Sequence, residues 1–230
     1  MQIVDVECYT LEVPIGRTVG DSRRSITDVY WIVVEVTTDT GHTGTGWMGS
    51  LGFGPELMAQ FIDSQFRDLL LGRSPFELTA IHEDLRRQTI YYGETGMAAW
   101  PRGAIDVALW DLKAQAAGEP LYRYLGGTER AVPVYASLMD ATEDNVETVA
   151  DRHGEYADQG FTAFKTKVGN RPAAEERRRV EAIRDRIGDE ADLFVDANQA
   201  WTVKEATDHV DAMSDAAPGW VEEPISEWDI

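Results

Sequence analysis

The stretch FTAFKTKVGN, residues 161–170, has the composition of a buried strand, yet Lys165 and Lys167 lie at its centre. The whole chain contains only four lysines, so two of them placed two positions apart in an apolar strand require an explanation. Residues two apart on a strand point to the same face of the sheet. We therefore expect both lysine side chains to project from one face of the strand AFKTKVG.

Strand and helix patterns alternate around this stretch from about residue 132 onward. The predicted strands are VPVYASL (132–138), AFKTKVG (163–169), DLFVDAN (192–198) and GWVEEP (219–224), and the predicted helices between them cover residues 144–159, 172–187 and 202–214. Lys167 precedes Asp196 by 29 residues, and Asp196 precedes Glu222 by 26. This spacing is typical of repeated βα units and a parallel sheet. It predicts an α/β segment at 131–230 that forms the first four βα units of a TIM-type (β/α) barrel.

The first 130 residues have a different pattern, which predicts a separate α+β domain at 1–130. Its expected elements are strands at residues 2–13, 30–37 and 42–48, a polar loop at 16–28, and helices at 55–71, 76–90 and 97–117. Asp39-Thr40-Gly41 is a turn sequence that joins the second and third strands. The three strands should therefore form a small antiparallel meander.

The charge balance excludes some classes of partner. Asp and Glu number 41 against 21 Lys and Arg, a net charge of −20, so we expect no nucleic-acid partner, because phosphate contacts need a basic surface. The acids are dispersed along the chain, and all but four of the basic residues are arginine. This composition suits a protein that stays soluble in concentrated salt, and we expect a halophilic source. An ordinary acidic cytosolic protein is the alternative.

The N-terminus and the single cysteine bear on the compartment. MQIVDVECYT lacks the basic start and apolar run of a signal peptide, and no apolar run approaches the ~18 residues of a membrane helix. Cys8 has no second cysteine with which to form an internal disulfide. We therefore expect a cytoplasmic protein that has no membrane partner.

Charged residues follow three neighbouring strands of the predicted barrel. They lie at the carboxyl ends of the strands, where β/α barrels carry their functional groups. The second predicted strand carries Lys165 and Lys167, the third carries Asp196 and Asn198, and the fourth carries Glu222. Two carboxylates on adjacent strands can hold Mg²⁺. A lysine near positive charge has a lowered pKa and can act as a base toward the carbon beside a carboxylate, while the metal stabilises the enediolate. Each residue alone has a structural explanation as a solvated lysine, a helix cap or a loop charge; their recurrence at successive strand ends favours a site.

Four motifs together resemble the enolase superfamily, in its mandelate racemase/muconate lactonizing enzyme group. They are GAIDVALWDLKAQAAGEPLYRYLGG at 103–127, FKTKVG at 164–169, VDANQAW at 195–201 and WVEEP at 220–224, and the resemblance extends over essentially the whole chain. It implies an enolase-like fold, with residues 1–130 as the capping domain. Loops of that domain at about 14–28 and 46–54 would close over the barrel mouth and select the substrate.

The resemblance also implies roles for the charged residues. Lys167 would be the catalytic base, and Lys165 would support it and bind the substrate carboxylate. Asp196 and Glu222 would be metal ligands for Mg²⁺, and Asn198 would lie close to substrate or metal. The expected enzyme is a lyase or isomerase that abstracts the α-proton of a small carboxylate substrate through a metal-stabilised enediolate, and we expect a homo-oligomer.

Within this family, Lys-Thr-Lys followed by WVEEP favours a sugar-acid dehydratase, with a mandelate racemase-like racemase next. A cycloisomerase or epimerase of the muconate lactonizing branch is the alternative, because that branch more often has glutamine where Glu223 stands. A non-catalytic metal-binding remnant is the hypothesis of another class.

Two other signals are weaker. Gly44-Thr-Gly46-Trp-Met-Gly49 matches G-x-G-x-x-G, but no helix pattern opens there, so we expect no dinucleotide site. None of the histidines falls at a barrel strand end, and none is assigned to catalysis: His42, His82, His153 and His209.

The barrel pattern stops after its fourth strand. An eight-stranded barrel takes roughly 200–250 residues, and 100 follow residue 130. We expect the C-terminal half, with the third metal ligand and the second acid/base group, to lie beyond residue 230. The favoured explanation is that the chain is part of a longer protein. The alternatives are that two copies or a separate second half complete the barrel, or that the chain is an inactive remnant.

Overall fold

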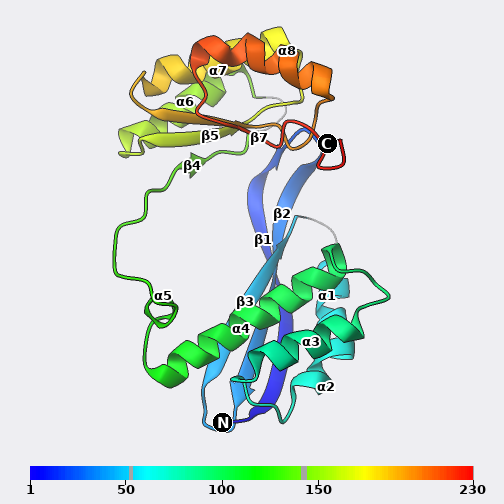
Figure 1. Cartoon of the computed structure of the whole chain (residues 1–230). Coiled ribbons are helices and arrows are strands. Elements are labelled where there is room, and N and C mark those ends of the chain that lie inside the picture. Colours follow the sequence, from blue (N-terminus) through cyan, green and yellow to red (C-terminus); the bar gives the residue numbers. More distant parts are fainter. Residues whose placement is uncertain (52–53, 141–143, 230) are drawn as a thin grey trace. The chain divides into compact units, whose positions relative to one another are not determined.

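The computed structural model describes residues 1–51, 54–140 and 144–229. The chain divides into two compact units, and each is described by itself (Figure 1). The first unit comprises residues 1–15 and 28–131, and the second comprises residues 16–27 and 132–230. Within the described residues, no helix is long and apolar enough to span a bilayer.

The first unit contains a three-stranded sheet in the order β1 (Ile3–Gly20), β2 (Ser25–Thr38), β3 (Thr43–Ser50). β2 and β3 are antiparallel, with Val34 opposite Gly46. Alternate residues of β2 are fully buried because only one face of the sheet packs against helices: Ile32, Val34 and Val36. The three predicted strands are confirmed.

The predicted polar loop at 16–28 is wrong for most of its length. β1 continues to Gly20 and β2 begins at Ser25, so most of this stretch is strand. The tip of the β1–β2 hairpin, residues 16–27, belongs to the second unit. Val19 and Ile26 are buried there, at 3% and 7% exposure. Only residues 21–24 form a turn, in which Asp21 Oδ1 accepts hydrogen bonds from the backbone N–H groups of the residues two and three positions on.

Helices cover the buried face of this sheet, as predicted. They are α1 (Pro55–Phe61), the π-helical η1 (Ile62–Phe66), α2 (Arg67–Leu70), α3 (Leu78–Gln88), the 3₁₀ segment η2 (Gly96–Ala98), α4 (Ala99–Ala117) and the short α5 (Leu121–Tyr124). The expected helix at 55–71 is therefore continuous but contains a π-helical turn. Residues from all three strands share one core with α1–α4.

The three glycines of the G-x-G-x-x-G sequence lie within β3, where the first two, Gly44 and Gly46, allow α4 to approach the sheet. A Cβ on Gly46 would lie 1.9 Å from the Ala104 carbonyl oxygen, and one on Gly44 would lie 2.1 Å from the Ala108 carbonyl oxygen. Gly44 and Gly46 are two residues apart on β3 and therefore lie on the same face of the sheet. Ala104 and Ala108 are one turn apart on α4 and therefore lie on the same face of the helix. Close helix–sheet packing therefore explains these glycines.

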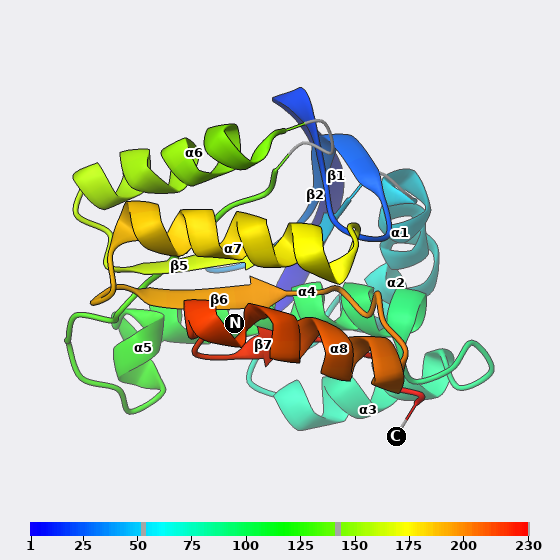
Figure 2. The same cartoon turned by 90° about the horizontal axis from the view of Figure 1, so that it is seen from above.

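The second unit contains a parallel sheet in the order β4 (Ala136–Ser137), β5 (Ala163–Lys167), β6 (Asp192–Asp196), β7 (Val221–Glu222). Three helices connect successive strands and pack together along one side of the sheet (Figures 1 and 2). They are α6 (Val146–Asp158), α7 (Ala173–Ile187) and α8 (Val203–Met213), the last of which is followed by the 3₁₀ turn η3 (Ser214–Ala216). The predicted βα alternation and the partial barrel are confirmed.

The first barrel strand is much shorter than predicted. Of residues 132–138, only Ala136 and Ser137 pair with β5. Val132 and Val134 are 69% and 68% exposed, and Pro133 between them has no N–H to donate to a ladder.

The two faces of the parallel sheet differ in chemistry. On β5, Phe164 packs in the core shared with α6–α8, whereas Lys165 and Lys167 point to the opposite face. On β6, Val195 packs in that core, and Asp196 lies across from Lys167 in the register. The face away from the helices therefore carries the charged side chains.

Candidate active site

The four predicted charged side chains meet at the carboxyl ends of β5, β6 and β7. Lys165 Nζ lies 2.9 Å from both carboxylate oxygens of Glu222 and 3.3 Å from Asp196 Oδ2. Lys167 Nζ lies 2.6 Å from the same Asp196 oxygen. The structure thus brings together all four groups, and their catalytic and metal-binding roles remain predictions.

Strand register produces this arrangement directly. β5 and β6 pair in parallel with Lys167 opposite Asp196, and β6 and β7 pair with Asp196 opposite Glu222. Lys165 is two residues before Lys167 and therefore shares its face. A shift of one residue in either strand pair would turn one set of charges toward the helices.

An aromatic layer lies beside the charges on the same face. The rings of Phe194 and Trp220 stack with centroids 3.4 Å apart, and Tyr135 meets both edge-on at 5.6 and 5.9 Å. Lys165 Nζ lies 5.7 Å from the centre of the Tyr135 ring. This aromatic layer was not predicted from the sequence, although the position of Phe194 two residues before Asp196 is the signal that locates it.

The surroundings favour the ionised forms of Asp196 and Lys165. Burial raises the pKa of Asp196, but the hydrogen bond and charge of Lys167, the Asn198 N–H and Lys165 together lower it below its ordinary value. Burial lowers the pKa of Lys165, but Glu222 and Asp196 outweigh it and raise the pKa above the usual range. The direction of the Lys165 shift follows from its contacts, which are carboxylates.

Asn198 lies at the edge of this cluster on the turn that follows β6. Its backbone N–H donates to Asp196 Oδ1 at 3.0 Å. Its side-chain oxygen is buried and has no hydrogen-bond partner within the part of the chain that the structure describes. Asn198, Gln199 and, after β7, Glu223 have positive φ angles of 48°, 61° and 43°. Left-handed backbone outside glycine is strained and concentrates at functional sites.

The tip of the β1–β2 hairpin contacts the residue stretch after β6. Ser22 Oγ donates to the Ala197 carbonyl at 2.7 Å, and Arg23 Nη1 donates to Gln199 Oε1 at 2.9 Å. The first expected capping loop, 14–28, therefore reaches the edge of the charged cluster through its turn. Of the second, 46–54, residues 46–50 belong to β3 and residues 52 and 53 lie outside the described residues.

The donor set suits a hard divalent cation in part. Asp196 and Glu222 supply carboxylate oxygens that both lie within hydrogen-bond distance of one ammonium, and the amide oxygen of Asn198 is without a partner among the described residues. Among those residues, no three His, Cys, Asp or Glu side chains form a group that could hold a metal ion. The residues present therefore fit part of a Mg²⁺ ligand set.

Comparisons with known proteins cover both units. Residues 5–126 match the mandelate racemase/muconate lactonizing enzyme N-terminal domain, and residues 148–230 match the enolase C-terminal domain-like family. The chain is 33% identical to the 3,6-anhydro-α-L-galactonate cycloisomerase of Streptomyces coelicolor over 96% of its length, and 31% identical to the L-talarate/galactarate dehydratase of Salmonella typhimurium over 94%. It spans 61% and 56% of the lengths of these two relatives.

Solved structures show the same similarity. A racemase from Streptomyces coelicolor A3(2) with bound magnesium superposes with a TM-score of 0.93 at 32% identity, covering 97% of this chain and 63% of that one. The Salmonella typhimurium L-talarate/galactarate dehydratase liganded with Mg and L-lyxarohydroxamate gives 0.92 at 30% identity, covering 100% and 60%.

Proposed function

The chain belongs to the mandelate racemase/muconate lactonizing enzyme family of the enolase superfamily, and from this premise we propose that it forms part of a Mg²⁺-dependent enzyme that abstracts the α-proton of a sugar acid. The observation that carries the proposal is the meeting of two lysines and two carboxylates on one face of a parallel sheet. Residues 1–130 would act as the capping domain and residues 131–230 as the first half of the barrel.

Each side chain of the cluster has a role that its position supports. Lys167 holds or accepts the proton at its Nζ atom. Asp196 orients this Nζ atom, which lies 2.6 Å from Asp196 Oδ2. Lys165 binds the substrate carboxylate through its ammonium group. Asp196 and Glu222 would hold Mg²⁺, with Asn198 beside them. When bound, the metal supplies positive charge next to the substrate carboxylate, where negative charge develops as the proton leaves.

The aromatic layer supports the same chemistry by placing apolar surface beside the charges. Phe194 is 9% exposed and stacks on Trp220, and Tyr135 meets both rings edge-on, while Tyr135 and Trp220 are 38% and 41% exposed. Electrostatic interactions strengthen in less polar surroundings, so an apolar layer beside the ion cluster increases the effect of each charge on the substrate.

The substrate class rests on the relatives. A dehydratase of talarate and galactarate and an arabinonate dehydratase resemble this chain, as does a cycloisomerase of anhydrogalactonate. All three act on sugar acids, which favours a sugar-acid substrate and a dehydration. Proton abstraction followed by cycloisomerisation is the second candidate, favoured by the 33% identity to the cycloisomerase. A homo-oligomer in the cytoplasm remains our expectation.

The test is the exchange of the substrate α-proton with solvent deuterium, measured by NMR on the full-length protein with a set of sugar acids and Mg²⁺. Lys167→Met removes the base and should lower the exchange rate by about 10²–10⁴-fold, while calorimetry still detects Mg²⁺ binding. Lys204→Met is the matched control, because this lysine is exposed and pairs only with Asp208 among the described residues. Exchange at the wild-type rate in Lys167→Met would exclude it as the base. Metal binding without exchange of any acid by the wild type would favour the non-catalytic scaffold.

A further inference from the structure

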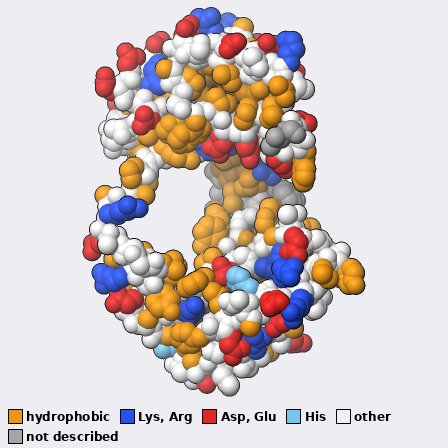
Figure 3. All heavy atoms as spheres, viewed as in Figure 1, with side chains coloured by type: hydrophobic (Ala, Val, Ile, Leu, Met, Phe, Trp, Pro, Cys, Tyr) orange, Lys and Arg blue, Asp and Glu red, His pale blue; other side chains and the backbone are white. Residues whose placement is uncertain are grey.

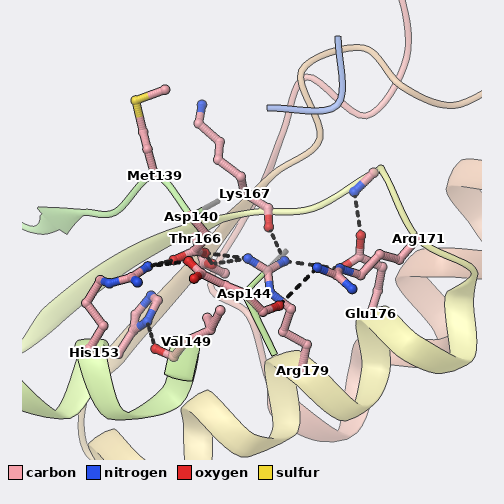
Figure 4. Close-up of polar contacts among 12 residues, drawn as sticks. Met139, Asp140, Asp144, Val149, His153, Thr166, Lys167, Arg171, Glu176 and Arg179 are labelled. Atoms are coloured by element: carbon pink, nitrogen blue, oxygen red, sulfur yellow. Dashed lines mark hydrogen bonds and ion pairs between the residues drawn. The ribbon is translucent and has the colours of Figure 1, made fainter. Parts of the chain in front are cut away.

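A set of buried charges lies on the opposite face of β5 from the two lysines. Asp140, Glu176 and Arg179 are 7%, 0% and 4% exposed, and they come from the segment after β4 and from α7 (Figure 4). We propose that these three are positioning residues, which hold the end of β5 so that Lys167 is presented to the active site. This inference rests on the proposed function of Lys167 as the base.

Two of the three contact the backbone that follows the lysine. Arg179 Nη1 donates to the Lys167 carbonyl oxygen at 2.5 Å, and the Gly169 N–H donates to Glu176 Oε1 at 2.9 Å. Arg179 and Glu176 are themselves an ion pair, with Nη1 and Oε2 3.3 Å apart. Residues 167–169 are thus held at two points by one pair of side chains. Figure 4 shows the Lys167 side chain projecting away from this pair while its carbonyl group points toward it.

Arg179 takes the place of a missing strand neighbour. The Lys165 carbonyl accepts a ladder hydrogen bond from the Leu138 N–H at 2.9 Å, just after β4. Two residues on, the Lys167 carbonyl points to the same side of β5, and its donor is the guanidinium of Arg179. The last carbonyl of the strand is therefore held by a side chain from a helix, and its position depends on where that side chain is fixed.

Asp140 fixes the guanidinium. Its carboxylate forms an ion pair with Arg179 Nη2 and a second one with Arg152 Nη1 at 2.7 Å. The backbone carbonyl of Asp140 accepts the Gly20 N–H at 3.2 Å. The same residue therefore connects the hairpin that reaches the cluster with the arginine that holds the end of β5.

Stability alone gives little reason for such a group. Removing charges from water is costly, and well-packed apolar side chains of similar volume often stabilise a fold as well as a buried ion pair does. A planar guanidinium whose two Nη groups bond to different acceptors, as in Arg179, does fix direction, which apolar contacts do not. Direction matters at Lys167, because a misplacement of about 1 Å of a reacting group can lower a rate about 10²-fold.

The experiment compares two arginines of α7 in the full-length protein. Arg179→Met removes the contact to the Lys167 carbonyl. Arg184→Met is the matched control, because Arg184 also donates to backbone carbonyls, those of Ala191 at 2.6 Å, just before β6, and Ala216 at 3.0 Å, in η3. The first readout needs no activity: lysine labelled with ¹³C at Cε alone gives one signal for each lysine, residues 1–230 contribute four of these signals, and Lys167→Met assigns the relevant one.

We expect Arg179→Met to shift or broaden the Lys167 signal, leave the Lys204 signal unchanged, and lower kcat for α-proton exchange about 10- to 100-fold with little change in KM. Arg184→Met should leave the Lys167 signal and kcat unchanged. An unchanged Lys167 signal in Arg179→Met, or the same shift in both variants, would overturn the inference.

A second variant covers the case in which Arg179→Met does not fold. Asp140→Asn keeps the side-chain shape and weakens the anchor, so it should move the Lys167 signal in the same direction, and no movement would count against the inference. Failure of the proposed function can be distinguished from failure of this inference. If the wild-type protein exchanges no α-proton, the catalytic role of Lys167 is wrong. The lysine signals would still decide whether Arg179 fixes the Lys167 side chain.

Discussion

Glycine-to-alanine substitutions on the two sides of the β3–α4 contact should change stability in opposite directions. Gly46 lies on β3, where a Cβ would be 1.9 Å from the Ala104 carbonyl oxygen and 2.8 Å from the Ala108 nitrogen. Gly103 lies in α4, where a Cβ would have no heavy atom within 4 Å. The same added methyl group therefore enters an occupied volume in one case and open space in the other.

The contact distances set the sizes of the two effects. Backbone atoms cannot rotate away as a side chain can, so β3 and α4 would have to separate by about 1.5 Å to reach an ordinary carbon–oxygen contact. A shift of this size places the overpacking cost near the upper end of about 1–3 kcal/mol, and the higher strand propensity of alanine offsets about 0.5–1 kcal/mol. We expect Gly46→Ala to lose about 2 kcal/mol. Gly103→Ala should gain about 0.8–1 kcal/mol, because glycine is a poor helix former.

Urea unfolding followed by far-UV circular dichroism measures both changes. Gly49→Ala is the control on the same strand: its Cβ would meet only the Trp31 ring, at 3.2 Å, and a side chain can yield. It should be nearly neutral. Gly46→Ala with wild-type stability would refute the packing explanation of the G-x-G-x-x-G sequence and reopen the question of what these glycines serve.

Two further predictions concern charges. Lys165 contacts both Asp196 and Glu222, so a cation held there would be repelled by roughly 1–2 kcal/mol even at the dielectric constant of water. Lys165→Met should therefore bind Mg²⁺ about 5- to 30-fold more tightly by calorimetry, and equal or weaker binding would contradict the arrangement. Burial lowers the pKa of His153, whose Nδ1 lies 2.8 Å from the Val149 carbonyl oxygen. A lowered folded-state pKa means that the unfolded chain takes up the proton first, so stability contributed by the neutral imidazole is present above about pH 6.5 and is lost as the pH falls. This loss of stability reaches at most about 2 kcal/mol at pH 5. Denaturant titrations at pH 7 and pH 5 measure it, and His153→Gln should remove the difference between the two pH values. An unchanged pH dependence in this variant would exclude His153 as its source.

The sequence was informative about the parallel sheet because its signals are local and periodic. A two-residue alternation placed Lys165 and Lys167 on one face, and the βα spacing placed Asp196 and Glu222 on the next two strands. Parallel pairing then needs only the correct register to bring these groups together. The meeting of the four side chains was therefore predictable, whereas their roles rest on family resemblance.

The hairpin and the buried charges were not predictable in the same way. Val19 and Ile26 are single apolar residues among polar ones, which is the composition of a loop, and their burial depends on the second unit. Glu176 and Arg179 belong to the helix AAEERRRVEAIRDRI, in which buried and exposed arginines cannot be told apart by periodicity alone. Their contacts with residues 167–169 and Asp140 are tertiary, so only the fold reveals them.

The acidic composition and the buried cluster respond to salt in different ways, which bears on the expected halophilic source. The net charge of −20 is spread over the chain, and Figure 3 shows acidic side chains scattered among basic ones on the visible face. Salt at 1 M screens exposed charges beyond about 3 Å, which relieves their mutual repulsion. Asp196 is only 2% exposed and lies 2.6 Å from Lys167, so its ion pair is screened far less. A protein built in this way can tolerate concentrated salt at its surface and keep the electrostatics of its site.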